Sequence, residues 1–373
     1  MWYRRMPWPL FLSTMLLVNF APAGDTAPEF RIATEGYRYE FPRDHGSHEA
    51  FRTEWWYYTG HLSAPDGRRF GYQLTFFRRG MSAEQIKTLP SRWSITQLYL
   101  AHFAVSDLSK KRFRYAEKIS RAGLGKAGAE QDRLHVWIDQ WIAESPIGSL
   151  RHTLEAAKGD LAIRLDLSPD KSPVVHGTGG ISRKGTAPSQ ASHYYSFTRL
   201  ATTGTVTVGK ESFNVTGVSW MDHEFGSADL GEDLVGWDWF SVQLDDRTEL
   251  MLYRLRRTDG SADPVSSGTV IAPDGRARHL SLEDFILEPL SYWTSSSSKA
   301  RYPQRWRLAI PSRQMALELS PLMPEQELST TESTHVTYWE GAIEATGTSH
   351  GRPIRGQGYM ELTGYAERFT KKL

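Results

Sequence analysis

The sequence contains no cysteine, which excludes disulfide bridges, thiolate metal sites, iron–sulfur clusters and a cysteine nucleophile. It also lacks an excess of one charge, because 44 basic and 43 acidic residues leave a formal net charge of +1. That balance excludes a nucleic-acid binder that depends on a strongly basic surface, so no nucleic-acid partner is expected. The motifs G-x-x-x-x-G-K-[ST] and H-E-x-x-H are absent, which excludes a P-loop and a zinc-protease helix.

Helical periodicity is scarce, and the composition favours strands and turns. Aromatic residues make up 12% of the chain, which also has 31 glycines and 19 prolines. The β-prone runs at 54–62 and 68–79 flank Asp66-Gly67, a typical hairpin turn. Residues 161–167 alternate Leu or Ile with Ala, Arg or Asp, which is the period of a half-buried strand. The sequence therefore predicts an all-β protein built from sandwiches or barrels.

Two further local signals lie in the C-terminal half. Residues 281–290 could form one short helix, with Ser281 as the N-cap and Asp284 three residues later. The last stretch of the chain predicts a final hairpin, with its turn at 347–351.

The one long apolar run lies at the N-terminus. Arg4 and Arg5 precede an apolar stretch at 7–20, and Ala21-Pro22-Ala23 follows with the A-x-A spacing of a cleavage site. This layout predicts a secretory signal peptide over residues 1–23, cleaved after Ala23. A membrane anchor is the alternative, but a spanning helix needs about 20 apolar residues. We therefore expect a periplasmic or secreted protein that is not an integral membrane protein.

The mature chain is expected to fold as two domains. A joint around residues 226–234 divides it into an N-terminal domain of residues 24–225 and a C-terminal domain of residues 226–373. A weak internal echo supports two halves, because residues 55–74 and 338–362 share one order of features. Each runs from an aromatic cluster through a strand and a glycine-containing turn to a second strand that begins with glycine and an aromatic residue.

The first chemically distinctive cluster is the aromatic run that begins at Glu54. On a strand, Glu54 and Trp56 share one face, whereas Trp55 and Tyr57 share the other. An ionised glutamate among aromatic rings is costly to bury unless it is paired. Two interpretations stay open: Glu54 accepts hydrogen bonds from an arginine or from backbone donors, or it lines a ligand cavity.

The second cluster is WMDHEFG at 220–226. If the preceding strand continues, Asp222 and Glu224 point to one side and His223 to the other. Two carboxyls in an aromatic setting can raise the pKa of one of them, which then holds a proton near neutral pH and serves as a general acid. The alternative is a polar strand end that is held by turn contacts.

Metal ligation has little support in the sequence. His45, His48 and His61 are candidate ligands, but no carboxylate pattern accompanies them at the usual spacing. We expect neither a metal ion nor a cofactor.

Several segments together resemble the carotenoid 1,2-hydratase (hydroxyneurosporene synthase) family. The closest resemblance is to its secreted AttH-like branch, whose members are often labelled predicted secreted hydrolases. The resemblance spans residues 48–365 and implies two tandem lipocalin-like (calycin) β-barrel domains. The matching segments are EWWYYTGHL (54–62), SHYYSFTRL (192–200), VTGVSWMDHEFGS (215–227), GWDWFSVQLDD (236–246) and YPQRWRLAIP (302–311).

The same resemblance implies a dry, apolar cavity for a hydrophobic molecule. Asp222, His223 and Glu224 match the acidic motif of the family, so the resemblance implies that they are the catalytic residues if the protein is an enzyme. The implied ligand-binding residues are Glu54, Trp55, Trp56, Tyr57, Tyr194, Tyr195, Trp220, Trp237 and Trp239.

Two functions follow as hypotheses. In the first, the protein is an exported lipocalin-like carrier of a lipid- or terpenoid-like ligand, accessory to the permease of an ABC exporter. In the second, it is a hydro-lyase that adds water to a terminal C=C bond of an acyclic carotenoid or terpenoid. The exported location favours the carrier, because carotenoid hydration works at the inner membrane. No catalytic triad in the sequence supports the hydrolase label.

Overall fold

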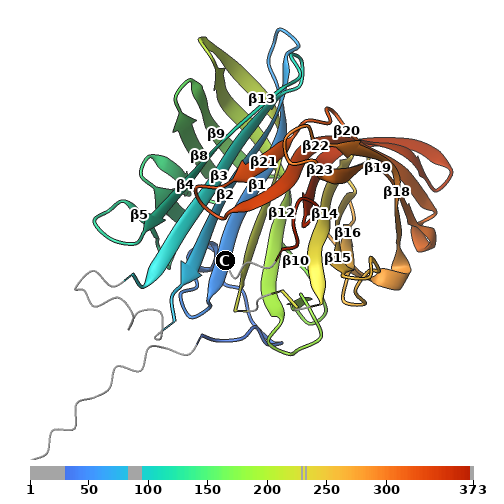
Figure 1. The fold of residues 1–373 in the computed structure, drawn as a ribbon, viewed down its shortest axis with the longest axis horizontal. Helices are drawn as coiled ribbons and strands as arrows, with labels where there is room; N and C mark the ends of the chain where they lie inside the picture. Colours follow the sequence, from blue (N-terminus) through green and yellow to red (C-terminus); the bar gives the residue numbers. More distant parts are fainter. Residues whose placement is uncertain (1–29, 83–94, 228–229, 232, 370–373) are drawn as a thin grey trace, which may run out of the picture.

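The computed structural model describes residues 30–82, 95–227, 230–231 and 233–369. Within these ranges the chain forms 23 β-strands and three 3₁₀ helices, and no α-helix (Figure 1). No helix in this part of the chain has the length and apolar character that a membrane span requires. The predicted signal peptide lies outside the described residues. The prediction of an all-β protein is confirmed.

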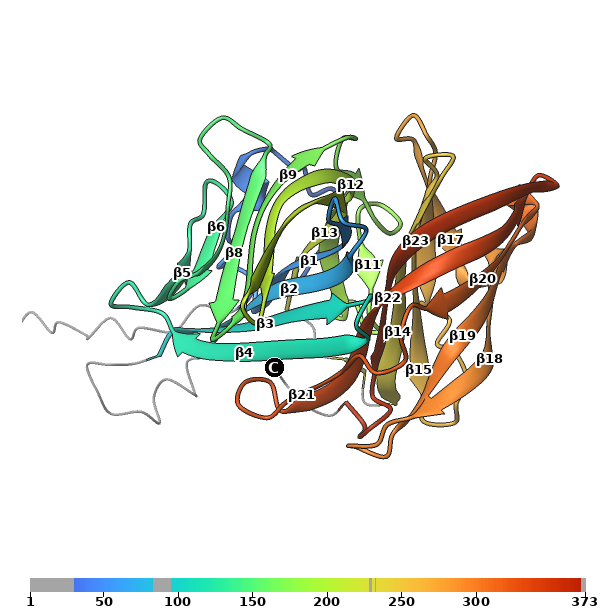
Figure 2. The ribbon, with the colours of Figure 1, turned by 90° about the horizontal axis from the view of Figure 1, so that it is seen from above.

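Thirteen strands form the first sheet, which curls into a nearly closed barrel (Figures 1 and 2). Its order is β4-β3-β2-β1-β13-β12-β9-β8-β7-β6-β5, and β10 and β11 pair with β12. Strands β3 and β4 approach β6, which brings the two ends of the sheet together. The strands are β1 (Thr53–Ser63), β2 (Arg69–Gly80), β3 (Gln97–Asp107), β4 (Arg112–Arg121), β5 (Ala127–Ala129), β6 (His135–Ile138), β7 (Trp141–Glu144), β8 (His152–Lys158), β9 (Leu161–Pro169), β10 (Val174–Val175), β11 (Ser182–Arg183), β12 (Ala191–Val208) and β13 (Glu211–Gly226).

The other ten strands form the second sheet, an open half-barrel beside the first (Figure 2). Its order is β17-β16-β15-β14-β23-β22-β20-β19-β18, with β21 paired to β22. These strands are β14 (Leu234–Leu244), β15 (Glu249–Arg257), β16 (Ser267–Ile271), β17 (Ala277–Ser281), β18 (Ile286–Thr294), β19 (Arg301–Ile310), β20 (Met315–Pro321), β21 (Glu327–Thr330), β22 (Val336–Ser349) and β23 (Arg352–Thr363). The 3₁₀ helices are η1 (Arg43–His45), η2 (Leu282–Asp284) and η3 (Pro311–Arg313).

The two sheets share a strand order, which identifies the internal repeat. In the first sheet β1 lies between β2 and β13, and in the second β14 lies between β15 and β23. The topology therefore relates the β1–β2 hairpin to the β14–β15 hairpin. The echo predicted between residues 55–74 and 338–362 is wrong, because the second segment is the β22–β23 hairpin. The two domains predicted at 24–225 and 226–373 stay a prediction, although the first sheet ends at Gly226 and the second begins at Leu234.

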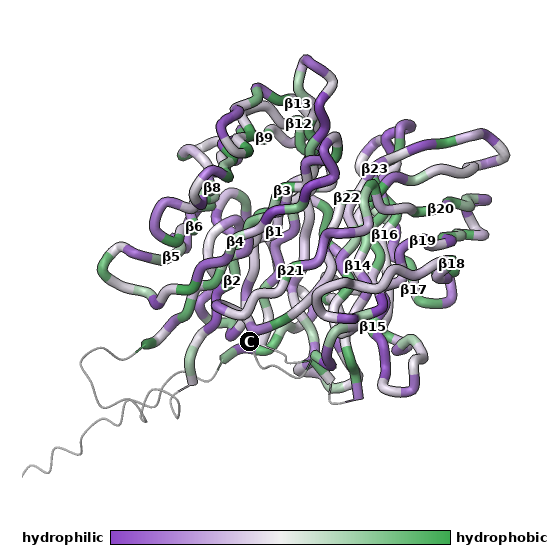
Figure 3. Tube along the Cα trace, turned by 45° about the horizontal axis from the view of Figure 1, so that its top comes forward, coloured by the Kyte–Doolittle hydropathy of each residue, from purple (hydrophilic) through white to green (hydrophobic). Residues whose placement is uncertain are grey.

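Local sequence explains most of the elements. Hydrophobic and hydrophilic residues alternate along many strands, as in β9 (Figure 3). The predicted helix at 281–290 is wrong beyond its first turn: Ser281 and Asp284 form the expected capping box on η2, but β18 begins at Ile286. Pro289 accounts for the difference, since proline disrupts a helix interior and is tolerated on an edge strand such as β18.

Three large hydrophobic clusters hold the fold together. One fills the first barrel, and a second fills the half-barrel. The third lies between the sheets, where Tyr57, Tyr194 and Trp220 of the first sheet meet Trp239 and Tyr253 of the second. Strand β1 lies close to β23, and β2 lies close to β22. The third cluster surrounds the candidate site.

Candidate functional site

The WMDHEFG segment forms the end of β13, and its side chains alternate as the sequence predicts. Asp222 and Glu224 line a cavity between the two sheets. His223 points to the opposite side of the strand, where its imidazole stacks on Trp56 with 4.9 Å between the ring centres. The three consecutive ionisable residues therefore belong to two separate sites.

Strand β1 divides its residues in the same way, because it pairs with β13. Trp55 lies opposite Glu224, and Tyr57 lies opposite Asp222. Trp55 and Tyr57 line the cavity between the sheets, whereas Glu54 and the fully buried Trp56 face the other side of the sheet.

The cavity has a volume of about 210 Å³. Strands of both sheets contribute to its walls, and half of the lining side chains are aromatic or aliphatic. It brings together many of the residues predicted from the sequence but excludes Glu54, Trp56, Tyr195 and His223. Trp220 packs behind the wall, in the cluster between the sheets. The predicted residues that line the cavity are Trp55, Tyr57, Tyr194, Asp222, Glu224, Trp237 and Trp239.

Asp222 is the best-organised acid in this cavity. Its Oδ1 accepts hydrogen bonds from the Trp220 indole N–H at 2.6 Å and from the Ser196 hydroxyl, and its Oδ2 accepts one from the Tyr194 hydroxyl at 2.8 Å. Burial raises the pKa of Asp222 to about 7 against the lowering effect of these three donors, with a further increase from the charge of Glu224. Asp222 is therefore poised to hold or to release a proton near neutral pH.

This raised pKa predicts a pH-dependent stability that Asp222→Asn should remove. Between the usual aspartate pKa of about 4 and the folded value of about 7, the folded protein binds one proton more than the unfolded chain. The free energy of unfolding of the wild type, relative to that of the variant, should fall as pH rises through this window, by up to about 1.4 kcal/mol per pH unit. Urea denaturation at several pH values measures this slope, and a difference that is independent of pH would contradict the assignment.

Glu224 is held by partners of its own. Its Oε1 accepts a hydrogen bond from the Ser192 hydroxyl and pairs with the Lys184 ammonium at 2.8 Å. Burial lowers the pKa of Lys184, but the neighbouring acidic groups, with Glu224 first among them, together outweigh burial and hold that pKa above its ordinary value. Lys184 therefore remains a cation and neutralises Glu224.

Two further acids in the cavity were missed by the sequence analysis. Glu340 on β22 and Glu361 on β23 are directly opposite each other in the sheet. Burial and the neighbouring Glu361 hold the pKa of Glu340 well above its usual range, and the Tyr57 hydroxyl donates to Glu340 Oε1 at 2.6 Å. Burial raises the pKa of Glu361 to about 7. The period-2 pattern Val336, Tyr338, Glu340 was the available signal, since it places the acid on a buried face.

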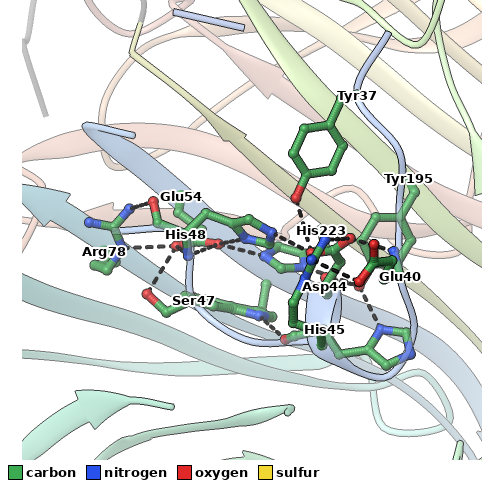
Figure 4. Close-up of polar contacts among 12 residues, drawn as sticks. Tyr37, Glu40, Asp44, His45, Ser47, His48, Glu54, Arg78, Tyr195 and His223 are labelled. Carbon is green, nitrogen blue, oxygen red and sulfur yellow. Dashed lines mark hydrogen bonds and ion pairs between the residues drawn. The ribbon is translucent and has the colours of Figure 1, made fainter. Parts of the chain in front are cut away.

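A second polar cluster lies on the other side of β1 and β13 (Figure 4). Glu54 Oε2 pairs with Arg78 Nε at 2.8 Å, and both side chains are fully buried. Glu54 Oε1 lies 2.9 Å from His223 Nε2 and 2.8 Å from His48 Nδ1. The Tyr195 hydroxyl lies 3.0 Å from His223 Nδ1. Of the two interpretations of Glu54, the structure favours the paired glutamate.

This cluster has the residue types of a metal site, since ligand atoms of His48, Glu54 and His223 lie within 4.8 Å of one another. The bonds already made argue against a cation there. Burial would raise the pKa of Glu54, but the Arg78 guanidinium and hydrogen bonds with His223 and His48 hold it well below its usual range. Arg78 thus supplies the positive charge. His61 lies elsewhere, bonded to the carbonyl oxygen of Gly358 at 2.7 Å.

A similar acid–arginine pair recurs in the second sheet, where the acid is fully buried and the arginine is partly buried. Asp238 on β14 lies opposite Arg254 on β15, just as Glu54 on β1 lies opposite Arg78 on β2. Arg254 Nη2 lies 2.7 Å from Asp238 Oδ2. The two acid–arginine pairs occupy equivalent places in the two sheets, although the residues around them differ. This recurrence supports a structural role for both pairs.

The pattern G-x-S-x-G occurs at 347–351 as GTSHG, within the predicted final hairpin. The structure confirms that hairpin, with the turn between β22 and β23, where Gly351 has a φ of +74°. The nucleophilic serine of a hydrolase sits instead on a strand-to-helix turn. This segment therefore gives no support to a hydrolase.

Comparison with known proteins places this architecture. A family model described as AttH-like matches residues 32–365. The solved structure of an AttH protein from Nitrosomonas europaea is 34% identical, covers 90% of this chain and all of that chain, and superposes with a TM-score of 0.81.

Two kievitone hydratases are also similar to this chain. The protein from Fusarium solani subsp. phaseoli is 22% identical over 265 residues, which are 70% of this chain and 73% of that protein. The structure of the protein from Nectria haematococca is 13% identical, covers 91% of this chain and 96% of that chain, and has a TM-score of 0.69. At this identity the structural likeness supports the two-barrel fold.

Proposed function

The chain belongs to the AttH-like family, and on that premise we propose that it is a hydratase-type lyase acting on a hydrophobic, unsaturated molecule bound between its two sheets. The observation that carries this proposal is Asp222, a buried acid on the wall of an aromatic cavity with a pKa near 7. A carrier of apolar ligands has no need of such a group, whereas hydration of an alkene begins with a proton donor.

The cavity suits an apolar ligand despite its ionisable residues. Near neutral pH the raised pKa values leave Glu340 neutral and Asp222 and Glu361 about half protonated. Of the other charged lining residues, Lys184 and Glu224 form an ion pair, and Arg79 Nη1 donates a hydrogen bond to the Thr53 hydroxyl at 3.4 Å. The charge of Arg79 is opposite in sign to the charge that remains on Asp222 and Glu361, so the wall carries little net charge against the binding of hydrocarbon.

In the proposed reaction, Asp222 donates its proton to one carbon of the double bond, and the π electrons form the new C–H bond. The other carbon becomes a cation, which the faces of Trp55 and Trp239 stabilise. A water oxygen then bonds to that carbon, and the proton it releases returns to the carboxylate of Asp222. The net change is alkene plus water to alcohol, and the reverse sequence is dehydration.

A hydrogen-bonded chain leads from Asp222 towards the second sheet. Ser196, which donates to Asp222, lies 2.6 Å from His176 Nε2, and His176 Nδ1 lies 2.9 Å from the Thr269 hydroxyl. Burial lowers the pKa of His176 to about 3, so its imidazole is neutral. These contacts fix the orientation of Ser196 and thereby of the acid.

The proposal is tested with labelled water. Purified protein in H₂¹⁸O is incubated with geraniol, its deoxy analogue 2,6-dimethylocta-2,6-diene and an acyclic carotenoid, and products are analysed by mass spectrometry. We expect ¹⁸O in a tertiary alcohol derived from at least one of them. If none is labelled while the probes bind saturably, the protein is a carrier. Export and an ABC-exporter partner stay predictions from the sequence.

A further inference from the structure

Two buried polar atoms on the cavity wall lack a hydrogen-bond partner among the described residues. They are Gln73 Oε1 and Glu340 Oε2. Gln73 is 2% exposed and Glu340 is 1% exposed, and both residues line the cavity. Buried polar atoms are nearly always hydrogen-bonded in native proteins, so two such atoms in one cavity point to a ligand that supplies the missing partners.

The amide of Gln73 is oriented by its neighbours. Its Nε2 donates to Thr75 Oγ1 at 2.8 Å and to the Tyr338 hydroxyl at 3.4 Å. The Tyr338 hydroxyl in turn lies 2.8 Å from His102 Nδ1. With the amide nitrogen committed, Gln73 Oε1 is left as an acceptor that requires a donor.

Glu340 offers the complementary atom. Its Oε1 already accepts the Tyr57 hydroxyl, and burial beside Glu361 keeps the carboxyl protonated. The acid proton on Oε2 is then a donor that requires an acceptor. Tyr338 and Glu340 are two residues apart on β22, and β22 lies close to β2, which carries Gln73. An acceptor and a donor thus belong to the same part of the wall.

We infer that Gln73 and Glu340 form a subsite for a hydroxyl group, so that the ligand is an oxygenated, otherwise apolar molecule rather than a pure hydrocarbon. A hydroxyl group can donate to Gln73 Oε1 and accept from Glu340 at the same time. This inference rests on the proposed function in taking the cavity as the substrate site. It narrows the substrate class to unsaturated alcohols or phenols.

The size of the cavity agrees with this class. Its volume of about 210 Å³ exceeds that of an engineered cavity of ~150 Å³ that holds benzene. One ring, or a short branched chain, fits inside together with its hydroxyl group. A long polyene would have to extend out of the cavity.

The subsite is tested by binding alone, with saturated probes that cannot be hydrated. The affinities of 3,7-dimethyloctan-1-ol and 2,6-dimethyloctane are measured by displacement of N-phenyl-1-naphthylamine. The ratio of the two affinities is then compared between the wild type and each variant, because the cost of removing the probes from water is the same for every protein and cancels. We expect Gln73→Leu to reduce the preference for the alcohol by about 10- to 100-fold. Glu340→Leu should do the same, whereas Glu340→Gln, which keeps a donor, should retain the preference.

Gln304→Leu is the matched control. Gln304 is also buried and lacks partners for both amide atoms, but it lies outside the cavity, so the preference should not change. The inference is overturned if Gln73→Leu leaves the ratio of alcohol to alkane affinity unchanged, or if the wild type does not prefer the alcohol. Water would then be the occupant of the subsite. A wild type that hydrates alkenes without preferring alcohols overturns only the subsite, whereas one that prefers alcohols and hydrates nothing overturns only the proposed function.

Discussion

Replacing Asp222 by asparagine is expected to lower the rate of hydration by about 10²- to 10⁴-fold, the usual contribution of a general acid. Asparagine keeps the shape of the side chain, and its carbonyl oxygen can still accept from Trp220 and Ser196. It has no acidic proton to give to an alkene. Ligand affinity should therefore change little while turnover is lost. Initial rates of ¹⁸O incorporation and probe titrations on the same preparation measure the two quantities separately.

Ser196→Ala is the companion variant. It tests whether Asp222 acts as the acid or only supports the fold. The hydroxyl of Ser196 donates to Asp222 and lowers its pKa, so removing it should raise that pKa. Activity depends on the protonated form and should decline as pH rises above about 7 in the wild type. In Ser196→Ala this decline should move to higher pH. Equal turnover by Asp222→Asn and the wild type would show that Asp222 is not the acid.

Much of the site follows from the period of two along a strand. The alternation of Glu54, Trp55, Trp56 and Tyr57 could be read from the sequence because β1 is regular and uninterrupted. The same rule separated His223 from its two acidic neighbours. The alternation of side chains along a strand does not depend on which strand it pairs with. The alternation predicted from the sequence therefore matches the folded protein.

The opposite wall of the cavity could not be found in this way. Glu340 and Glu361 belong to the last hairpin and meet Asp222 only because β22 and β23 pack against β1 and β2. Lys184 follows the short strand β11 in a glycine-rich stretch that reads as a plain loop. Contacts between sheets depend on the relative placement of two barrels, and no short-range pattern in the sequence encodes it.

The repeat was misassigned for a related reason. Aromatic residues are dense in both the β1–β2 and the β22–β23 hairpins because both border the interface, not because they are equivalent. The relation that topology identifies joins Glu54–Arg78 to Asp238–Arg254, and these pairs share charge, register and a tryptophan directly after the acid.

Arg78→Met should cost the first barrel about 3–5 kcal/mol in free energy of unfolding, because it leaves the Glu54 carboxylate buried without its counter-ion. It also removes the hydrogen bonds that Arg78 donates to the carbonyl oxygens of His48 and Phe51, at 2.9 and 2.7 Å. Arg254→Met is the matched control. The cost there should be smaller, since Asp238 keeps Arg256 at 3.2 Å and the Tyr365 hydroxyl at 2.8 Å.

The loss of stability in Arg78→Met should also depend on pH. The direction of this dependence shows whether the missing charge of Arg78 causes the loss. Without the guanidinium, a proton on His48 or on Glu54 itself would neutralise the buried charge, and the carboxylates of Asp44 and Glu54 already raise the pKa of His48 against the effect of burial. A histidine whose pKa is raised on folding stabilises the protein below its unfolded pKa of about 6.5, and this contribution disappears as pH rises through the folded value. Chemical denaturation of Arg78→Met should therefore show a smaller deficit near pH 5.5 than near pH 8.5. A deficit that is equal at both pH values, and no larger than that of Arg254→Met, would mean that the hydrogen bonds of Arg78 matter here and its charge does not.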